Sequence, residues 1–236
     1  MADQDTQASE PAQGGSPDPA ELFPFPLDDF QLEAIDALNQ GHSVVVSAPT
    51  GSGKTLVGEY AIHRAMAHGQ KVFYTTPLKA LSNQKLRDFR EQFGAENVGL
   101  MTGDLSVNRD ASIVVMTTEI FRNMLYAEAD EHDDPLADVE AVVLDECHYM
   151  NDSQRGTVWE ESIIHSPPPV QLVALSATVA NAGQLTDWIE KVHGPTRLVL
   201  SDFRPVPLHF GFCSAKGLHP LLNEQGTGLH PNCKVW

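Results

Sequence analysis

Short apolar runs, many of them β-branched, alternate along the chain with longer segments of helical periodicity. The runs that predict strands lie at 43–47, 71–75, 98–101, 113–117, 141–144, 170–175 and 197–200. Continuous apolar runs of this length are typical of parallel strands covered on both faces. Helical patterns lie between Asp28 or Asp29 and Gly41, between Leu56 and Gly69, and over 78–93, 120–126, 154–165 and 183–192. The alternation predicts an α/β fold with a doubly wound, mostly parallel sheet and helices on both faces.

The first helical pattern carries Leu32, Ile35 and Leu38 on one face, which we expect to be buried. Beyond 205 the regular alternation fails, and the segment 216–236 shows no clear element. The regular fold is therefore expected to end near 204.

An octapeptide after the first strand has the composition of a phosphate-binding loop. Its residues are Ala48, Pro49, Thr50, Gly51, Ser52, Gly53, Lys54 and Thr55. Gly51 and Gly53 let the backbone bend so that N–H groups point inward around an anion, helped by the N-terminus of the next helix. Lys54 can then reach the β- and γ-phosphates, and the Thr55 hydroxyl can bind Mg²⁺. Ala48 replaces the usual first glycine, and a surface turn is the alternative, but strand, loop and helix together favour a nucleoside triphosphate site.

Further candidate residues fall at the carboxyl ends of predicted strands. Pro77, Thr117, Asp145 and Ser176 each follow such a strand, as the loop does. In a doubly wound sheet, ligands bind beyond these ends. We therefore expect these residues to form one site with the phosphate loop.

Asp145 and Glu146 follow the apolar run at 141–144, where a nucleotide hydrolase holds its metal carboxylate. Asp145 would hold Mg²⁺ opposite the loop, and Glu146 would orient or deprotonate the attacking water. The pair could instead cap a helix. A lone histidine such as His148 is often structural, and Ser176 and Thr178 could be turn residues.

Composition indicates a globular chain with an uneven charge. The 236 residues are 42% hydrophobic, and the formal net charge is −17. A tail at 1–20 lacks Lys and Arg, and a second acidic segment occupies 128–140; we expect both to be solvated. Acidity argues against a simple nucleic-acid binder, but local sites can use backbone amides and a few cations.

Three cysteines, Cys147, Cys213 and Cys233, have neither metal nor disulfide spacing, which suits a reducing cytosol. No signal peptide is visible, and no apolar run reaches membrane-spanning length. We expect a soluble, cytoplasmic protein without a membrane partner.

Taken together, these motifs resemble the front half of the superfamily 2 DExH-box helicases. The matching positions are Gln31, 48–55, 77–81, 145–148 and 176–178. The runs 77–85, 99–104, 116–120, 152–161 and 203–208 look like one branch, the superkiller/antiviral RNA helicases, relatives of the exosome-assisting helicase of the nucleus. The resemblance covers the chain from about Phe23 onward and implies a RecA-like P-loop NTPase domain.

The resemblance also implies roles for particular residues. Lys54, Asp145 and Glu146 would be catalytic. Thr55 and Asp145 would bind Mg²⁺, and Gln31 would select ATP over GTP. RNA would be bound through its sugar-phosphate backbone, without sequence preference. The residues that would contact it are Pro77, Lys79, Gly103, Thr117 and Thr118. His148, Ser176 and Thr178 would couple hydrolysis to movement. Cys147 departs from the Val or Ile common in the family and is expected to pack similarly.

The expected organisation is a disordered acidic tail at 1–21, a RecA-like domain at 22–204 and a linker at 205–236. The second RecA-like domain of the family has no counterpart in this sequence, so the chain is expected to bind Mg·ATP but barely hydrolyse it. The favoured function is the ATP-binding motor domain of an ATP-dependent RNA helicase. The alternatives are a DNA helicase of the related repair branch and a truncated, non-catalytic nucleotide-binding fragment.

Overall fold

The computed structural model describes residues 15–126, 136–152, 155–214, 217–223 and 227–230. The chain divides into two compact units, Met1–Phe203 and Arg204–Trp236. Most of the predicted tail, and the acidic residues at 128–134, lie outside the described residues. The last part of that tail is ordered, because Asp18 caps a short helix, α1 (Pro19–Leu22), through its carboxylate.

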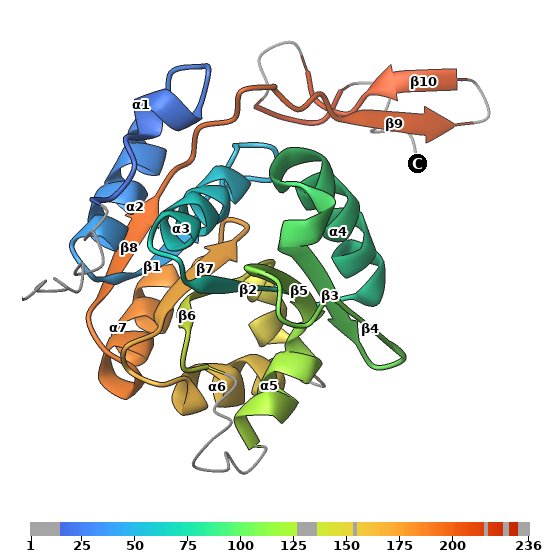
Figure 1. Cartoon of the computed structure of the whole chain (residues 1–236). Coiled ribbons are helices and arrows are strands. Elements are labelled where there is room, and N and C mark those ends of the chain that lie inside the picture. The colour runs from blue at the N-terminus through green and yellow to red at the C-terminus, as the bar shows by residue number, and fades with distance from the viewer. Residues whose placement is uncertain (1–14, 127–135, 153–154, 215–216, 224–226, 231–236) are drawn as a thin grey trace, which may run out of the picture. The chain divides into compact units, whose positions relative to one another are not determined.

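The first unit is built on an eight-stranded sheet in the order β4-β3-β5-β2-β6-β7-β1-β8 (Figure 1). All neighbouring pairs are parallel except β3 with β4. The strands are β1 (Ser43–Ser47), β2 (Lys71–Thr76), β3 (Val98–Thr102), β4 (Leu105–Val107), β5 (Ile113–Thr117), β6 (Val139–Leu144), β7 (Gln171–Ser176) and β8 (Thr196–Leu200). The predicted mostly parallel α/β sheet is confirmed.

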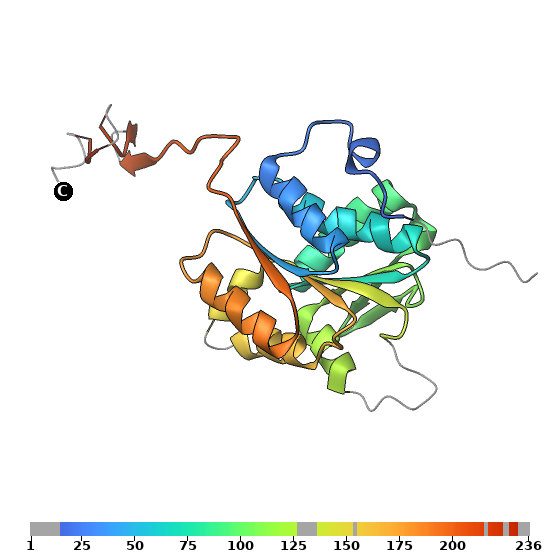
Figure 2. The ribbon, with the colours of Figure 1, turned by 90° about the vertical axis from the view of Figure 1, so that its left-hand side faces the viewer.

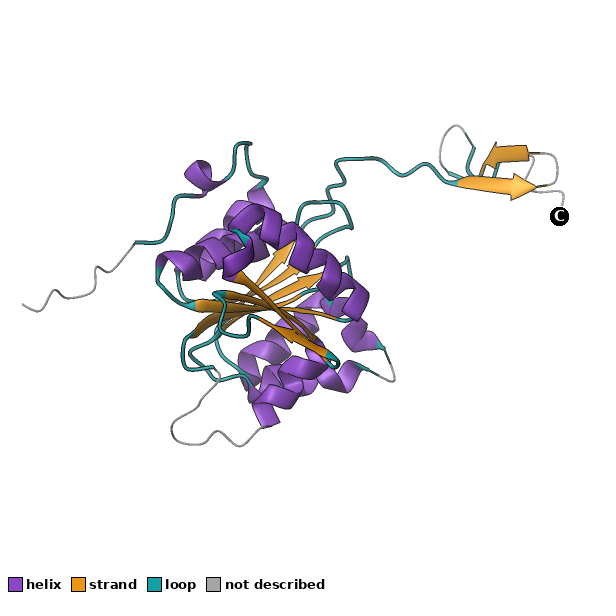
Figure 3. Cartoon of the chain, turned by 45° about the vertical axis from the view of Figure 1, so that its right-hand side comes forward, coloured by secondary structure: helices purple, strands orange, loops and turns teal. Residues whose placement is uncertain are grey.

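Helices cover both faces of this sheet (Figures 2 and 3). One face carries α2 (Asp29–Asn39), α3 (Thr55–Ala67) and α4 (Lys79–Phe93), and the other carries α5 (Thr118–Tyr126), α6 (Gly156–His165) and α7 (Ala182–Val192). Two short 3₁₀ helices, η1 (Ala95–Asn97) and η2 (Cys147–Asn151), complete the unit.

Alternation along each strand divides the buried side chains between two cores. In β1, Val44 and Val46 pack with α2 and α3, whereas Val45 packs with the opposite helices. In β2, Tyr74 faces the first core and Phe73 the second. Because both faces are covered, the central parts of the inner strands, such as 44–46 in β1 and 141–144 in β6, are continuously apolar, which is the pattern that the sequence shows.

The expected buried face of α2 was wrong in one position. Leu32 is 46% exposed, whereas Phe30, Ala34, Ile35 and Leu38 are buried. At about 100° per residue, Leu32 lies on the side of the helix opposite this stripe.

Two sets of strands were missed by the sequence prediction. β4 is an antiparallel edge strand of only three residues, all exposed, and a Leu-Ser-Val run is too short to give a clear strand pattern. In the second unit, β9 (Gly211–Ser214) pairs antiparallel with β10 (Gly217–Pro220), although no element was expected beyond 216. Four-residue strands that include Pro220 give a weak pattern.

One acidic residue that was expected to be solvated, Glu140, is partly buried, with a side chain only 11% exposed. Glu140 in β6 binds the Arg64 guanidinium at 2.5 Å and His68 Nδ1 at 2.8 Å. Arg64, 3% exposed, also donates to Leu38 O and to the Gln171 side chain. The cluster joins α2, α3, β6 and β7 at the amino ends of the strands.

Candidate nucleotide-binding site

The phosphate loop connects β1 directly to α3. Gly51 and Gly53 have φ angles of 84° and 83°, a left-handed conformation that L side chains rarely adopt. Between them Ser52 is 3% exposed, and its hydroxyl has no hydrogen-bond partner among the described residues. A buried polar atom without a partner costs free energy unless a ligand satisfies it. The loop therefore has the backbone conformation and the unmet hydrogen-bonding capacity of an anion site.

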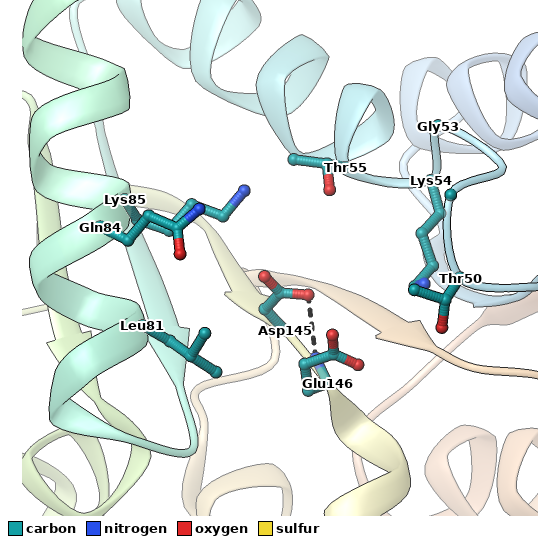
Figure 4. Close-up of a pocket in the computed structure, with 10 residues that line it drawn as sticks. Thr50, Gly53, Lys54, Thr55, Leu81, Gln84, Lys85, Asp145 and Glu146 are labelled. Carbon is teal, nitrogen blue, oxygen red and sulfur yellow. Dashed lines mark hydrogen bonds between the residues drawn. The ribbon is translucent and has the colours of Figure 1, made fainter. Parts of the chain in front are cut away.

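A cavity of about 460 Å³ opens beside the loop (Figure 4). Loop residues Thr50, Gly51, Gly53, Lys54 and Thr55 line one side. The other side is lined by Leu81, Gln84 and Lys85 of α4 and by Asp145 and Glu146. The structure thus brings the loop and Asp145 to one cavity, as predicted, whereas Pro77, Thr117 and Ser176 are not among the residues that line it.

Lys54 is 6% exposed and forms no ion pair within the described part of the chain. A buried, unpaired ammonium group that lines a cavity is suited to an anionic ligand. Across the cavity lie the Asp145 and Glu146 carboxylates (Figure 4). Lys54 on one side and two carboxylates on the other match a ligand that combines phosphates with a cation.

Asp145 extends the line of β6 and is held by three hydrogen bonds. Its backbone N–H donates to Thr75 O at 3.0 Å. Its Oδ1 accepts from the Glu146 N–H at 2.9 Å, and its Oδ2 accepts from the Tyr74 hydroxyl at 2.8 Å. Burial, and then the Asp145 charge, hold the pKa of Tyr74 well above its usual value. Tyr74 is therefore a permanent donor to this carboxylate.

Glu146 adopts a left-handed backbone conformation, with φ of 53°. Its Oε2 lies 3.2 Å from His148 Nδ1, and the same nitrogen lies 3.4 Å from the Ala177 N–H. A single nitrogen can donate to Glu146 when protonated or accept from Ala177 when it is not, but cannot do both. His148 thus joins the acidic pair to the segment after β7.

That segment contains the predicted coupling residues Ser176 and Thr178. Ser176 is buried and its hydroxyl donates to Ala177 O at 2.8 Å, while Thr178 is exposed. Ser47, at the end of β1, accepts from the Val179 N–H at 3.4 Å. The segment therefore lies between the end of β1 and His148.

Gln31 does not line the cavity, but from helix α2 it contacts the phosphate loop. Its Nε2 donates to Gly53 O at 3.0 Å, and its Oε1 accepts from the Asp28 N–H at 2.9 Å. It is 5% exposed. One N–H and one lone pair of the amide stay available for a base edge.

The residues predicted to grip RNA are not equally exposed. Lys79 and Gly103 are exposed and Thr117 is partly buried, whereas Pro77 and Thr118 are buried. The Thr118 hydroxyl donates to Thr76 O at 3.2 Å, so this side chain has a structural role. Lys79 forms an exposed ion pair with Asp104. A contact to RNA from Thr118 would have to come from its backbone.

Sequence reasoning missed the α4 wall and Tyr74. Leu81, Gln84 and Lys85 recur at i, i+3 and i+4, the spacing of one helix face, which was a readable signal. Tyr74 looked like an ordinary apolar strand residue. Only the pairing of β2 with β6 brings its hydroxyl to Asp145.

The side chains present fit a magnesium ion. The Thr55 hydroxyl and the Asp145 carboxylate supply hard oxygen ligands to one cavity. The described residues contain no cluster of three or more His, Cys, Asp or Glu that could hold a metal alone. Mg²⁺ typically takes one or two protein ligands and completes its shell with phosphates and water.

Cys147 packs in the second core, and burial raises the pKa of its thiol to about 12. It replaces an apolar residue sterically, as expected.

Among the described helices, none combines the length and apolar character needed to cross a membrane.

A family model, the DEAD/DEAH box helicases, matches residues 28–185. This chain belongs to the DEAD/DEAH box helicase family. The match runs from the helix that carries Gln31 to the helix after Thr178, so it contains every element around the cavity.

Curated relatives within the family are similar over most of this chain. It is 55% identical over 211 residues to the chloroplastic DExH-box ATP-dependent RNA helicase DExH15 of Arabidopsis thaliana, covering 89% of the chain and 18% of that protein. It is 48% identical over 217 residues to the antiviral helicase SKI2 of Saccharomyces cerevisiae, covering 92% and 17%. The predicted likeness to the superkiller/antiviral branch is confirmed. The chain spans about a fifth of the length of these relatives.

Solved structures show the same fold at lower identity. The helicase domain of Hef from Pyrococcus furiosus matches with a TM-score of 0.56 and 23% identity, over 73% of this chain and 37% of that one. A hypothetical ATP-dependent RNA helicase from Sulfolobus tokodaii matches with a TM-score of 0.57 and 21% identity, over 75% and 53%. These neighbours share the fold of this chain, and the predicted RecA-like fold is confirmed.

Proposed function

We propose that this chain is the ATP-binding motor domain of an ATP-dependent RNA helicase, which couples ATP hydrolysis to movement along RNA or to its unwinding. The observation that carries the proposal is the cavity in which Lys54 and Thr55 face Asp145 and Glu146. A phosphate loop opposite two carboxylates at a strand end is the arrangement that phosphoryl transfer requires.

In the proposed reaction, the loop amides and Lys54 bind the β- and γ-phosphates. Thr55 and Asp145 would hold Mg²⁺, which when bound offsets negative charge on the phosphates. Glu146 accepts a proton from the attacking water, or orients it, because its carboxylate lines the same cavity. Gln31 selects adenine with the parts of its amide that Gly53 and Asp28 leave unused.

The proposed nucleic-acid partner is RNA, bound through its backbone by exposed groups near Lys79, Gly103 and Thr117. Two relatives, DExH15 of Arabidopsis thaliana and mtr4 of Schizosaccharomyces pombe (48% identical over 217 residues), are named ATP-dependent RNA helicases. The alternative, a DNA helicase, draws on a structural neighbour described as a helicase bound to DNA, whose 22% identity supports the fold alone. Because Asp and Glu outnumber Lys and Arg in this chain by 32 to 15, we expect RNA binding to be weak and strongly weakened by salt.

Phosphate release by a full-length version tests the proposal, since the relatives are about five times longer than this chain. We expect single-stranded RNA to stimulate release more strongly than single-stranded DNA of the same sequence. Stronger stimulation by DNA would favour the repair-type helicase. Nucleotide binding without turnover, with RNA present, would favour a non-catalytic fragment.

We place the protein in a reducing compartment such as the cytoplasm. Cys147 and Cys213, the two cysteines that the structure describes, are free thiols. One relative is named as chloroplastic, so localisation of a tagged full-length protein is the test.

A further inference from the structure

Tyr74 has a hydroxyl group that core packing does not require. Its ring is fully buried in the first core, where it meets Phe89 of α4 edge-on with ring centroids 4.9 Å apart. A phenylalanine would fill the same space. Burying a hydroxyl costs free energy unless it is hydrogen-bonded, and the bond that this hydroxyl makes is to Asp145 Oδ2, at 2.8 Å.

The register of the sheet explains how a strand residue reaches this carboxylate. Tyr74 lies opposite Val143 in the β2–β6 pair, and the Asp145 N–H continues the ladder by donating to Thr75 O. The ring of Tyr74 stands on the α3–α4 face of the sheet, the face on which the phosphate loop opens into α3. The hydroxyl therefore meets the carboxylate on the side of the sheet where the cavity lies.

The two oxygens of Asp145 are each held by one donor. Oδ1 accepts from the Glu146 N–H and Oδ2 from Tyr74. An ionised carboxylate offers about four lone-pair sites, so about two are left for a ligand. Two donors in different directions fix the rotation of the carboxylate about its last bond. Without Tyr74, only the Glu146 N–H would restrain that rotation.

We propose that Tyr74 is a positioning residue that orients the Asp145 carboxylate toward the metal of a Mg·nucleotide. The inference rests on the proposed function, because it assigns Asp145 to Mg²⁺. Tyr74 itself does not line the cavity and would touch neither the nucleotide nor the ion. Groups that hold a metal ligand in this way typically change metal affinity by about 10- to 100-fold when removed.

The side of the cavity formed by α4 also contacts the ring of Tyr74. Lys85 Nζ lies 5.4 Å from the centroid of Tyr74 and lines the cavity with Leu81 and Gln84. The Tyr74→Phe substitution leaves this cation–π contact and the Phe89 contact in place. The substitution therefore removes one hydroxyl and leaves the α4 side of the cavity unchanged.

The chain contains a matched control in Tyr60. Its ring is also fully buried, and its hydroxyl donates to Asn39 Oδ1 at 2.9 Å, away from the cavity. Tyr60→Phe and Tyr74→Phe each delete one buried, hydrogen-bonded hydroxyl. A loss of stability alone should therefore appear in both variants, whereas a change in metal use should appear in only one.

The experiment measures binding of a fluorescent, non-hydrolysable ATP analogue to the 236-residue chain across a Mg²⁺ titration. Tyr74→Phe should raise the Mg²⁺ concentration for half-maximal binding by about 10-fold or more, with binding in EDTA unchanged. Tyr60→Phe should leave both quantities unchanged, and circular dichroism should show that both variants fold. In an Asp145→Asn background, Tyr74→Phe should have no further effect on the Mg²⁺ requirement.

An unchanged Mg²⁺ requirement in Tyr74→Phe would overturn the inference while leaving the proposed function intact. An equal change in Tyr60→Phe, or effects of Tyr74→Phe and Asp145→Asn that simply add, would overturn it as well. If the unmodified chain showed no Mg²⁺-dependent binding at all, the proposed function would fail and this inference with it.

Discussion

Gln31 Nε2 donates a hydrogen bond to Gly53 O at 3.0 Å and so ties helix α2 to the phosphate loop. A Cβ atom at position 53 would lie 2.8 Å from that nitrogen, which is closer than real Cβ atoms come. Glycine at 53 therefore serves two needs, the left-handed backbone and the approach of Gln31. One side chain connects the expected base-selecting position with the expected phosphate-binding position.

Gln31→Ala should weaken ATP binding and reduce the preference for ATP over GTP by about 10-fold, because a hydrogen-bonding reader leaves polar groups unpaired with the wrong base. Competition of ATP and GTP against a fluorescent nucleotide measures this preference. Gln40→Ala is the control, since Gln40 is an exposed glutamine bonded to Asp36 just beyond the same helix. A preference that survives in Gln31→Ala would assign base selection to another residue.

Glu146→Gln in a full-length version should slow ATP hydrolysis at least about 100-fold while nucleotide affinity stays nearly unchanged. The amide keeps the shape of the side chain but cannot accept a proton. Single-turnover hydrolysis and equilibrium binding separate the two effects. Glu33→Gln is the matched control, because Glu33 is an exposed glutamate paired with Arg197 on the surface. Near-normal turnover in Glu146→Gln would move the role elsewhere.

The chain of 236 residues should release phosphate at well below about 1 s⁻¹, with or without RNA. Negative charge that develops on the γ-phosphate oxygens meets Lys54, loop amides and Lys85 in this cavity, but no arginine lines it among the described residues. An arginine finger is worth about 10³–10⁵ in rate. Steady-state phosphate release measures the turnover, and a rate of about 1 s⁻¹ or more would show that this cavity needs no further cation.

Arg64→Met should lower the free energy of unfolding by about 3–5 kcal/mol, because it leaves the Glu140 carboxylate, only 11% exposed, without its buried guanidinium partner. Urea denaturation measures this difference. Arg197→Met, which breaks an exposed pair with Glu33, should cost no more than about 1 kcal/mol. Equal losses in the two variants would contradict a structural role for the buried cluster.

The inner strands were predictable because burial on both faces makes their central residues continuously apolar, as at 44–46 of β1 and 141–144 of β6. Elements that bury little were not predictable. The exposed strand β4 and the hairpin of β9 and β10 lack that signal. Leu32 was wrongly predicted to be buried, because three apolar residues at helical spacing define the buried face of a helix only loosely. In the folded chain Phe30 and Ala34 are buried instead.

The site was predictable where local sequence sets local geometry, as in the loop around Gly51 and Gly53. Contacts that depend on strand register were not. Tyr74 reaches Asp145 only because β2 pairs with β6, and Thr118 is buried against Thr76 only because β5 pairs with β2. His148 looked like an isolated histidine, yet its ring lies between Glu146 and Ala177.

The most direct test of the central claim is isothermal titration of Mg·ATP into the chain and into Lys54→Ala. Lys54 is buried at the cavity wall without an ion pair among the described residues, so it should supply a charge-assisted contact to phosphate. We predict that Lys54→Ala weakens binding by about 1.5–3 kcal/mol, and that Lys191→Ala, on α7 and exposed, leaves it unchanged. Equal affinity of Lys54→Ala and the unmodified chain would contradict the assignment of this cavity to ATP.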